Sequence, residues 1–224
     1  MSSFVDDEGR LRDQAVAACG YDDFGDEQEP KQTLAKSKSR PGNYNLEDSI
    51  VVVETLKGAG SGFYISPRQV LTNAHVVGDS EFVQMRDFNG KQTTGKVIKK
   101  DLGSDLALVS VSRAGIPLQF SKGCKVNRRE EVFTIGHPKG YEYSTTRGIV
   151  SSIRNMENPF VRAAGKYSYV QVDAPISEGN SGGPLFNSSE KVIGVNTFTR
   201  SDGQNLNFAV HCEEIMQFLD SGRP

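Results

Sequence analysis

Short β-type segments follow one another through most of this sequence, and this pattern limits the chain to a few folds. Runs of a few residues rich in valine, isoleucine, phenylalanine, tyrosine and threonine recur between residues 50 and 210. Turn-forming pairs such as Asn89-Gly90 and Asp202-Gly203 separate several of them. Many short strands without intervening helices predict a β-sandwich or a β-barrel. One helical pattern is found, at about residues 213–219.

The charge balance excludes some classes of partner. The chain has 26 lysine and arginine residues against 28 aspartate and glutamate residues, a net charge of -2. A nucleic-acid binder or a polybasic membrane anchor carries a clear basic excess. No apolar run approaches the roughly 18 residues that a membrane helix requires. We therefore expect no nucleic-acid partner and no membrane span.

The cysteines and the first residues lead to expectations about the compartment. Cys19, Cys124 and Cys212 are odd in number and widely spaced, and none forms a CxxC pair. This pattern predicts neither a disulfide framework nor a structural zinc site. The opening residues are acidic and polar, unlike a signal peptide. On these grounds we expect a cytoplasmic protein that binds no metal.

The first 45 residues differ from the rest. Residues 1–30 are mainly acidic, residues 31–40 carry only basic charges, and neither stretch has a sustained hydrophobic period. This composition is typical of a disordered tail or of an arm that docks a partner, and the sequence leaves both interpretations open.

A glycine-rich motif surrounds Ser181 in the segment GNSGGPL, residues 179–185. Glycine permits tight, positive-φ backbone, which allows amide N–H groups to converge beside a hydroxyl. Donors placed in this way stabilise the oxyanion of an acyl-transfer reaction. A serine nucleophile also needs a base, and without one the motif is equally consistent with a flexible turn.

Two further motifs supply a base and a carboxylate. His75 lies in LTNAHVV, and imidazole is the natural general base near neutral pH. Asp105 begins the apolar run DLALV, where an unpaired carboxylate is costly. The chain order His75, Asp105, Ser181 is one of the orders in which serine-protease triads occur. The three motifs together predict nucleophilic acyl transfer.

The segments TNAHVV, SDLALVSV and GNSGGPL resemble the triad motifs of chymotrypsin-fold peptidases, most closely the protease domain of the HtrA/Deg group. The similarity extends over about residues 50 to 220. It implies an all-β fold of two six-stranded antiparallel β-barrels (the trypsin-like fold) with a short C-terminal helix. The implied organisation is an N-terminal arm (1–45) and a protease domain (46–224), itself divided into a first barrel (about 46–118), a second barrel (about 119–210) and a helix (about 211–220).

The resemblance also implies the roles of individual residues. Ser181 is expected to be the nucleophile, His75 the general base, and Asp105 the group that orients the imidazole. The backbone N–H groups of Gly179 and Ser181 are expected to form the oxyanion hole. The substrates are expected to be proteins or peptides, cleaved without a cofactor or metal.

Substrate preference is inferred from the residues before Ser181. Trypsin-like enzymes place an aspartate six residues before the nucleophile, and this chain has Pro175 there. Without that acid, cleavage after basic residues is disfavoured, so we expect a small or aliphatic P1 residue. The candidate pocket-lining positions are Ile176, Asn196, Thr197 and Phe198.

The sequence departs from the family pattern at three places. The Asn-Pro that usually precedes GNSGG is Ser177-Glu178 here. The usual Gly-Asn-Pro is Gly136-His137-Pro138 here, in a loop that affects whether the site is preorganised at rest. The HtrA group usually carries PDZ domains after the protease, and we expect none in this chain. Members of the group often assemble as trimers through N-terminal segments, so Tyr21 and Phe24 are candidate contacts for a homo-oligomer or a regulatory partner.

Two alternatives remain open. A glutamyl endopeptidase of the staphylococcal V8 type shares the fold, although Gly183 and Asn196 occupy places where that group has serine and histidine. A latent peptidase fold that acts as a peptide-binding module is the alternative from another class. A cysteine-nucleophile relative is excluded because position 181 is serine.

Overall fold

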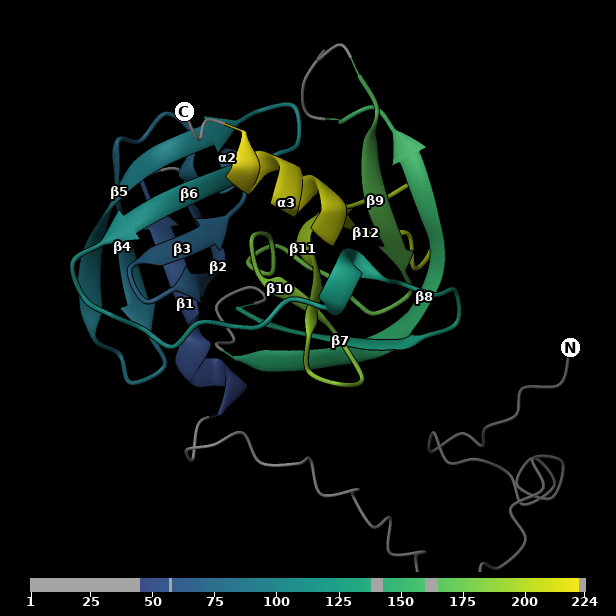
Figure 1. Ribbon diagram of the computed structural model, residues 1–224, viewed down its shortest axis with the longest axis horizontal. Coiled ribbons are helices and arrows are strands. Elements are labelled where there is room, and N and C mark those ends of the chain that lie inside the picture. The colour runs from purple at the N-terminus through teal and green to yellow at the C-terminus, as the bar shows by residue number, and fades with distance from the viewer. Residues whose placement is uncertain (1–44, 57, 138–142, 160–164, 222–224) are drawn as a thin grey trace, which may run out of the picture. The chain divides into compact units, whose positions relative to one another are not determined.

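The computed structural model describes residues 45–56, 58–137, 143–159 and 165–221 (Figure 1). All of them belong to one compact unit, Tyr44–Pro224. The predicted arm, with Tyr21 and Phe24, lies outside the described residues.

Six antiparallel strands form a first closed barrel in the order β1-β2-β3-β6-β5-β4. Their bounds are β1 Ile50–Thr55, β2 Gly58–Ser66, β3 Gln69–Thr72, β4 Phe82–Asp87, β5 Gln92–Asp101 and β6 Leu106–Val111. A 3-10 turn, η1 (Leu46–Ser49), precedes β1, and a one-turn helix, α2 (Ala74–Val77), follows β3. Valine side chains such as Val53, Val70 and Val109 fill the interior, because alternate residues of each strand point inward.

The second half of the chain closes another barrel in the order β10-β11-β12-β9-β8-β7. Its strands are β7 Glu131–Gly136, β8 Ser144–Met156, β9 Tyr167–Val172, β10 Pro184–Asn187, β11 Val192–Thr199 and β12 Asn207–His211. The connection between the barrels contains η2 (Lys122–Cys124), and helix α3 (Cys212–Asp220) follows β12. The prediction of two six-stranded barrels with a short C-terminal helix is confirmed.

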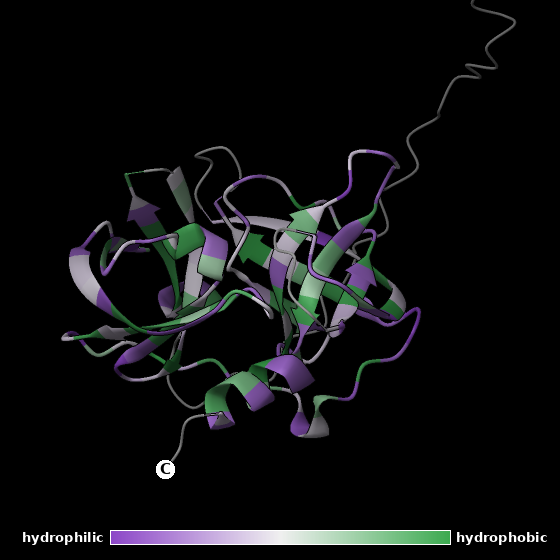
Figure 2. Ribbon diagram, turned by 90° about the horizontal axis from the view of Figure 1, so that it is seen from above, coloured by the Kyte–Doolittle hydropathy of each residue, from purple (hydrophilic) through white to green (hydrophobic). Residues whose placement is uncertain are grey.

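One hydrophobic cluster joins the two barrels. It includes Phe63 and Leu71 from the first barrel and Phe186 and Val195 from the second, all fully buried. Helix α3 packs on this cluster through its apolar side and turns its polar residues outward, so it carries both kinds of residue in Figure 2. Because the cluster is continuous, the loops above it are held at defined positions relative to one another.

A disulfide bond joins Cys124 to Cys212, with 5.4 Å between their Cα atoms. The prediction that no such bond forms is therefore wrong. The two residues are 88 positions apart, and they meet because the inter-barrel connection runs beside β11, where Ser121 N–H donates to the Val192 carbonyl (2.9 Å). Cysteine spacing along the chain could not reveal this pairing, and an odd total leaves room for one pair.

Within the described ranges, no helix is both long enough and apolar enough to cross a membrane.

Candidate active site

His75 lies on α2, directly after β3. Its backbone N–H donates to Asp105 Oδ1 (3.0 Å), and its ring Nδ1 lies 2.8 Å from Asp105 Oδ2. The imidazole side chain is 33% exposed, whereas the Asp105 side chain is 4% exposed. A buried carboxylate therefore orients a ring that solvent and substrate can reach.

Asp105 occupies the turn that leads into β6, and its backbone has a positive φ of 57°. Aspartate is one of the few residues other than glycine that adopt this conformation readily. The Asp105 carbonyl accepts hydrogen bonds from the Asn73 side-chain amide (2.8 Å) and from Ala74 N–H (3.2 Å). The carboxylate and the backbone of Asp105 thus both bind the start of α2.

Ser181 lies in a tight loop between β9 and β10, which we call the nucleophile loop (residues 177–183). Gly179 and Gly182 have positive φ angles of 96° and 85°. A Cβ on Gly182 would lie 2.1 Å from the Ser61 carbonyl oxygen, so only glycine fits there. The loop is tied to the first barrel by a hydrogen bond from Ser61 N–H to the Ser181 carbonyl (2.8 Å).

Thr197 on β11 connects the serine with the carboxylate. Its hydroxyl donates to Asp105 Oδ2 (2.5 Å), and its carbonyl accepts from Ser181 Oγ (3.1 Å). The structure therefore brings the three residues predicted from the motifs into one site between the barrels. Sequence reasoning placed Thr197 in the substrate pocket, whereas the residue is only 2% exposed and bonds to the carboxylate.

The backbone donors of the nucleophile loop are arranged around Asn180. Asn180 N–H donates to the Ser177 carbonyl (3.0 Å), and the Gly179 carbonyl accepts from the Ser61 hydroxyl (2.7 Å). Among the described residues, no acceptor receives the N–H groups of Gly179 and Ser181. These two donors are available to a ligand.

The other predicted pocket residues are largely buried. Asn196 is fully buried and its amide donates to the Thr134 hydroxyl (2.5 Å). Ile176 is 7% exposed and packs in the core of the second barrel. The Phe198 ring stacks on Phe208 with 4.7 Å between ring centroids.

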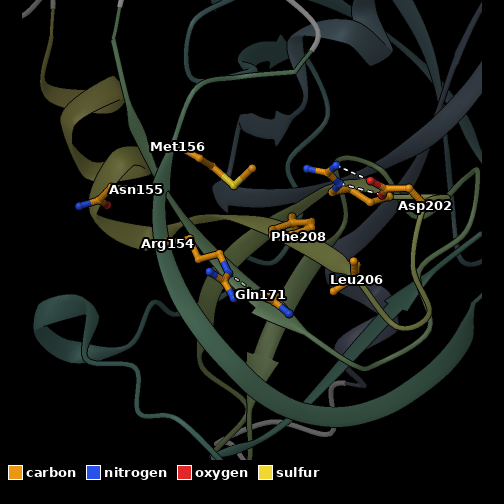
Figure 3. A pocket seen from close by; sticks show the side chains of 8 residues that line it. Arg154, Asn155, Met156, Gln171, Asp202, Leu206 and Phe208 are labelled. Carbon is orange, nitrogen blue, oxygen red and sulfur yellow. Dashed lines mark hydrogen bonds and ion pairs between the residues drawn. The ribbon is translucent and has the colours of Figure 1, made fainter.

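A small hollow and a larger pocket lie beside the end of β11. The hollow, of about 310 Å³, is lined by Met156, Pro159, Phe198, Thr199 and Arg200. The larger pocket, of about 430 Å³, shares two of these residues and is shown in Figure 3; its lining residues are Arg154, Asn155, Met156, Gln171, Arg200, Asp202, Leu206 and Phe208.

The two arginines of this pocket are already paired. Arg154 Nε donates to Gln171 Oε1 (2.5 Å), and Arg200 forms an ion pair with Asp202 (2.5 Å). The hydrogen bond from Arg200 lowers the pKa of Asp202, and the same contact raises the pKa of Arg200. The ion pair with Asp202 balances the charge of Arg200, whereas Arg154 bonds to an uncharged amide and keeps its positive charge at the pocket.

Two buried ionisable side chains of the second barrel, Tyr169 on β9 and His211 on β12, have shifted pKa values. Burial raises the pKa of Tyr169, which has Asp105 among its neighbouring charges. Burial also lowers the pKa of His211, whose Nδ1 caps α3 by accepting from Glu213 N–H (3.2 Å). Within the described ranges, no group of three or more histidine, cysteine, aspartate or glutamate side chains is placed to hold a metal ion.

Comparison with known proteins gives the family. Residues 60–195 match the trypsin-like peptidase domain. A DegP-like protein of Ectopseudomonas mendocina, named as a probable periplasmic serine endoprotease, is 40% identical over 70% of this chain and 34% of its own length. A protein of the same name from Hahella chejuensis is 38% identical over 73% of this chain and 35% of its own length. The chain thus spans about a third of these relatives.

A solved structure agrees with the sequence relatives. The active form of the Rv3671c protease from M. tuberculosis superimposes with a TM-score of 0.72 at 26% identity, covering 78% of this chain and 80% of that one.

The names of the relatives contradict the expected cytoplasmic location, because several DegP-like proteins that match this chain are called periplasmic. The expectation rested on the polar opening residues, and the absence of a signal-like segment there is not evidence of a compartment. The fold, the family match and the relatives agree with one another. The chain belongs to the trypsin-like peptidase family, within the HtrA/DegP-like group of serine proteases.

Proposed function

We propose that this protein is a serine endopeptidase that cleaves proteins or peptides through Ser181, His75 and Asp105. The observation that carries the proposal is the hydrogen-bond connection between the two barrels. Asp105 Oδ2 lies 2.8 Å from His75 Nδ1 and also accepts from the Thr197 hydroxyl, while the Thr197 carbonyl accepts from Ser181. A nucleophile, a base and an orienting carboxylate are thereby gathered at one place.

In this mechanism Ser181 Oγ attacks the scissile carbonyl carbon, and His75 accepts the hydroxyl proton. The imidazolium then donates this proton to the leaving amine, which leaves an acyl-enzyme on Ser181. A water molecule, deprotonated by His75, attacks the ester and releases the acid product. Asp105 keeps the proton of neutral His75 on Nδ1, so that Nε2 is free to act as the base.

The N–H groups of Gly179 and Ser181 would bind the oxyanion that forms on the substrate carbonyl. Both groups are held by the backbone of the nucleophile loop, so they need little reorganisation as the charge develops. Such donors are a large source of rate acceleration in acyl transfer.

A small or aliphatic P1 residue is the preference that the surroundings of Ser181 support. The Thr199 hydroxyl lies 2.8 Å from Asn207 Oδ1 and 3.2 Å from the Ile176 carbonyl oxygen, and it can donate its single proton to either of these acceptors. Asn207 in turn donates to the Ala174 carbonyl (2.9 Å). These bonds connect β11 with the segment before Ser181, and no charged side chain takes part in them, which favours an uncharged P1 side chain.

The position that holds a buried aspartate in trypsin-like enzymes is Pro175 here, and the acid of the nucleophile loop, Glu178, is exposed. The nearest acid before the loop is Asp173, and its Oδ1 accepts from Ile149 N–H (2.6 Å). A glutamyl preference is also not favoured, because Asn196 directs its amide to Thr134.

The disulfide bond supports an oxidising compartment. Structural disulfides persist mainly outside the cytosol, and the DegP-like relatives are named periplasmic. We infer that the protein acts outside the cytosol.

The test is cleavage of casein and of a peptide library by the protein and by a Ser181→Ala variant, with mass spectrometry of the new ends. Cleavage that is lost in the variant and occurs after small or aliphatic residues supports the proposal. Glutamate at P1 supports the V8 alternative instead. Equal cleavage by both proteins contradicts a role for Ser181, and absence of cleavage by both favours the latent peptide-binding fold.

A further inference from the structure

We propose that Ser61 and His137 are positioning residues that hold the oxyanion-binding backbone of the nucleophile loop in its working conformation. The inference rests on the peptidase function proposed above. It assigns a role to a buried serine of the first barrel and to a buried histidine that the triad does not use.

Ser61 binds the nucleophile loop on both sides of Asn180. Its backbone N–H donates to the Ser181 carbonyl (2.8 Å), and its hydroxyl donates to the Gly179 carbonyl (2.7 Å). Ser61 is fully buried on β2. One residue of the first barrel therefore holds the two carbonyls that flank Asn180 in a loop that belongs to the second barrel.

The loop needs such support because its own backbone is permissive. Gly179 has a φ of 96°, a conformation that glycine enters and leaves at little cost. A peptide unit is planar, so its C=O and N–H groups point in opposite directions. Holding the Gly179 carbonyl on Ser61 directs Asn180 N–H to Ser177. The two peptide units that Ser61 holds lie on either side of the unit that carries Ser181 N–H, and the unit that carries Gly179 N–H adjoins the first of them, so Ser61 restricts the rotation of both.

His137 determines where the Ser61 hydroxyl points. Its Nδ1 lies 3.1 Å from Ser61 Oγ. A hydroxyl has one proton, and a carbonyl oxygen can only accept. Since Ser61 donates its proton to Gly179, His137 must donate from Nδ1–H to Ser61 Oγ. The Nδ1–H group of His137 thus binds a lone pair of Ser61 Oγ, so that the hydroxyl proton of Ser61 is directed to the Gly179 carbonyl.

Packing keeps the His137 ring in place. The residue is 4% exposed, and its ring meets the edge of Tyr143 with 4.5 Å between centroids. Tyr143 in turn packs on Phe88 of the first barrel at 4.6 Å. The HtrA/Deg motif has asparagine where this chain has His137, so the arrangement is a feature of this chain's own residues.

The kinetic consequence is specific. Donors that bind the oxyanion act mainly in the transition state, so disturbing them lowers kcat and leaves KM nearly unchanged. Loss of an oxyanion donor costs on the order of 100-fold in kcat. Because Ser61→Ala only loosens such donors, we expect a decrease of about 10-fold or more.

Kinetic tests compare Ser61→Ala, His137→Phe and the double variant with the wild type. His137→Phe keeps an aromatic ring against Tyr143 and removes the N–H donor. Ser66→Ala is the matched control, because Ser66 lies on the same strand and bonds only to Gln69 at 3.2 Å. We expect lower kcat with unchanged KM in both single variants. The double variant should lose about as much kcat as Ser61→Ala alone, since both changes disrupt the same connection from His137 through Ser61 to the nucleophile loop.

The control should match the wild type. Additive losses in the double variant, or a rise in KM with unchanged kcat, overturn the proposal. If Ser61→Ala does not fold, as judged by circular dichroism, the kcat of His137→Phe alone decides.

A second measurement does not depend on activity. Nitrogen-15 NMR of labelled histidine reports which ring nitrogen carries the proton, with signals assigned from His75→Gln and His211→Gln variants. We expect His137 to be protonated on Nδ1 and its signals to shift in Ser61→Ala. An unprotonated Nδ1 in the wild type overturns the proposal, even if the protein cleaves nothing and the peptidase function itself fails.

Discussion

The two barrels contribute to the site in different ways. The first barrel holds His75 and Asp105 on two short turns that hydrogen-bond to each other through both side chain and backbone. The second barrel supplies Ser181 on a glycine loop whose main anchor, Ser61, belongs to the first. The acid–base pair is therefore built within one barrel, whereas the nucleophile and its oxyanion donors depend on contacts between the barrels.

Removing the charge of Asp105 is expected to give the largest loss of activity, because it disrupts the His75–Asp105 pair of the first barrel. In Asp105→Asn the amide tolerates the positive φ and keeps the turn, but it favours the wrong tautomer of His75. We expect kcat to decrease by about 10⁴-fold with little change in the far-ultraviolet circular dichroism spectrum. Asp79→Asn, which changes an aspartate whose side chain is 92% exposed, serves as control. A loss of less than about tenfold in Asp105→Asn contradicts this role.

Removing the disulfide bond is expected to lower the stability of the fold more than the activity of the site. The Cys124→Ala/Cys212→Ala variant frees α3 and the inter-barrel connection. We expect the free energy of unfolding in urea to fall by about 2–4 kcal/mol, because an 88-residue loop is no longer closed. Since the hydrogen bonds from Ser61 to the nucleophile loop and from Thr197 to Asp105 involve neither cysteine, kcat under folding conditions should change little. Unaltered stability on removal or reduction of the bond is the contrary result.

Thr197 tests the connection between the halves. Thr197→Val keeps the shape and removes the hydroxyl that donates to Asp105 Oδ2. A hydrogen bond to a charged group contributes about 1.5–3 kcal/mol, so we expect kcat to decrease by about tenfold or more. Thr197→Ser, which keeps the hydroxyl, should retain most of the activity. Equal kcat values for the two variants count against the connection.

We expect the smallest effect from the titration of His211, which changes the stability of the folded protein with pH. His211 lies in the second barrel. Burial lowers its pKa in the folded protein, so the unfolded chain binds more protons just below the ordinary pKa of histidine. This contribution to stability is complete above about pH 6.5 and is lost as the pH falls toward the lowered value. Glu213 and Glu214 oppose the shift without cancelling it.

Thermal unfolding between pH 7.5 and 5.5 measures this contribution. His211→Asn keeps an N-cap acceptor for α3 and removes the titration, so its melting temperature should fall less with pH than that of the wild type. Parallel pH profiles contradict the assignment.

The strand pattern predicted a sandwich or a barrel, and the two barrels were implied by the resemblance of the three motifs to the HtrA/Deg group, because the information in each motif is local. Alternating hydrophobic runs specify strands, and TNAHVV, SDLALV and GNSGGPL each carry their own turn chemistry. Thr197, Ser61 and the disulfide depend on contacts between residues far apart in the chain. The hydrogen bond from Ser61 to Gly179, for example, joins positions 118 residues apart.

The predictions of the compartment and of the pocket-lining residues also depended on information that the local sequence does not contain. The polar opening residues led to a wrong location, and they do not bear on the disulfide that closes later in the chain. Asn196 and Phe198 lie on β11, and the direction of their side chains depends on Thr134 and Phe208 beside them. Ser61 lies in the segment GSGF before His75, and its partner Gly179 could be identified only in the folded protein.

Labelling with a fluorophosphonate tests the central claim most directly. The reagent modifies only an activated serine, and peptide mapping by mass spectrometry identifies the modified residue. We predict a single adduct on Ser181 in the wild type and in Ser66→Ala, and none in His75→Ala. An adduct at another serine, or equal labelling of Ser181 without His75, would contradict the assignment of these two residues as nucleophile and base.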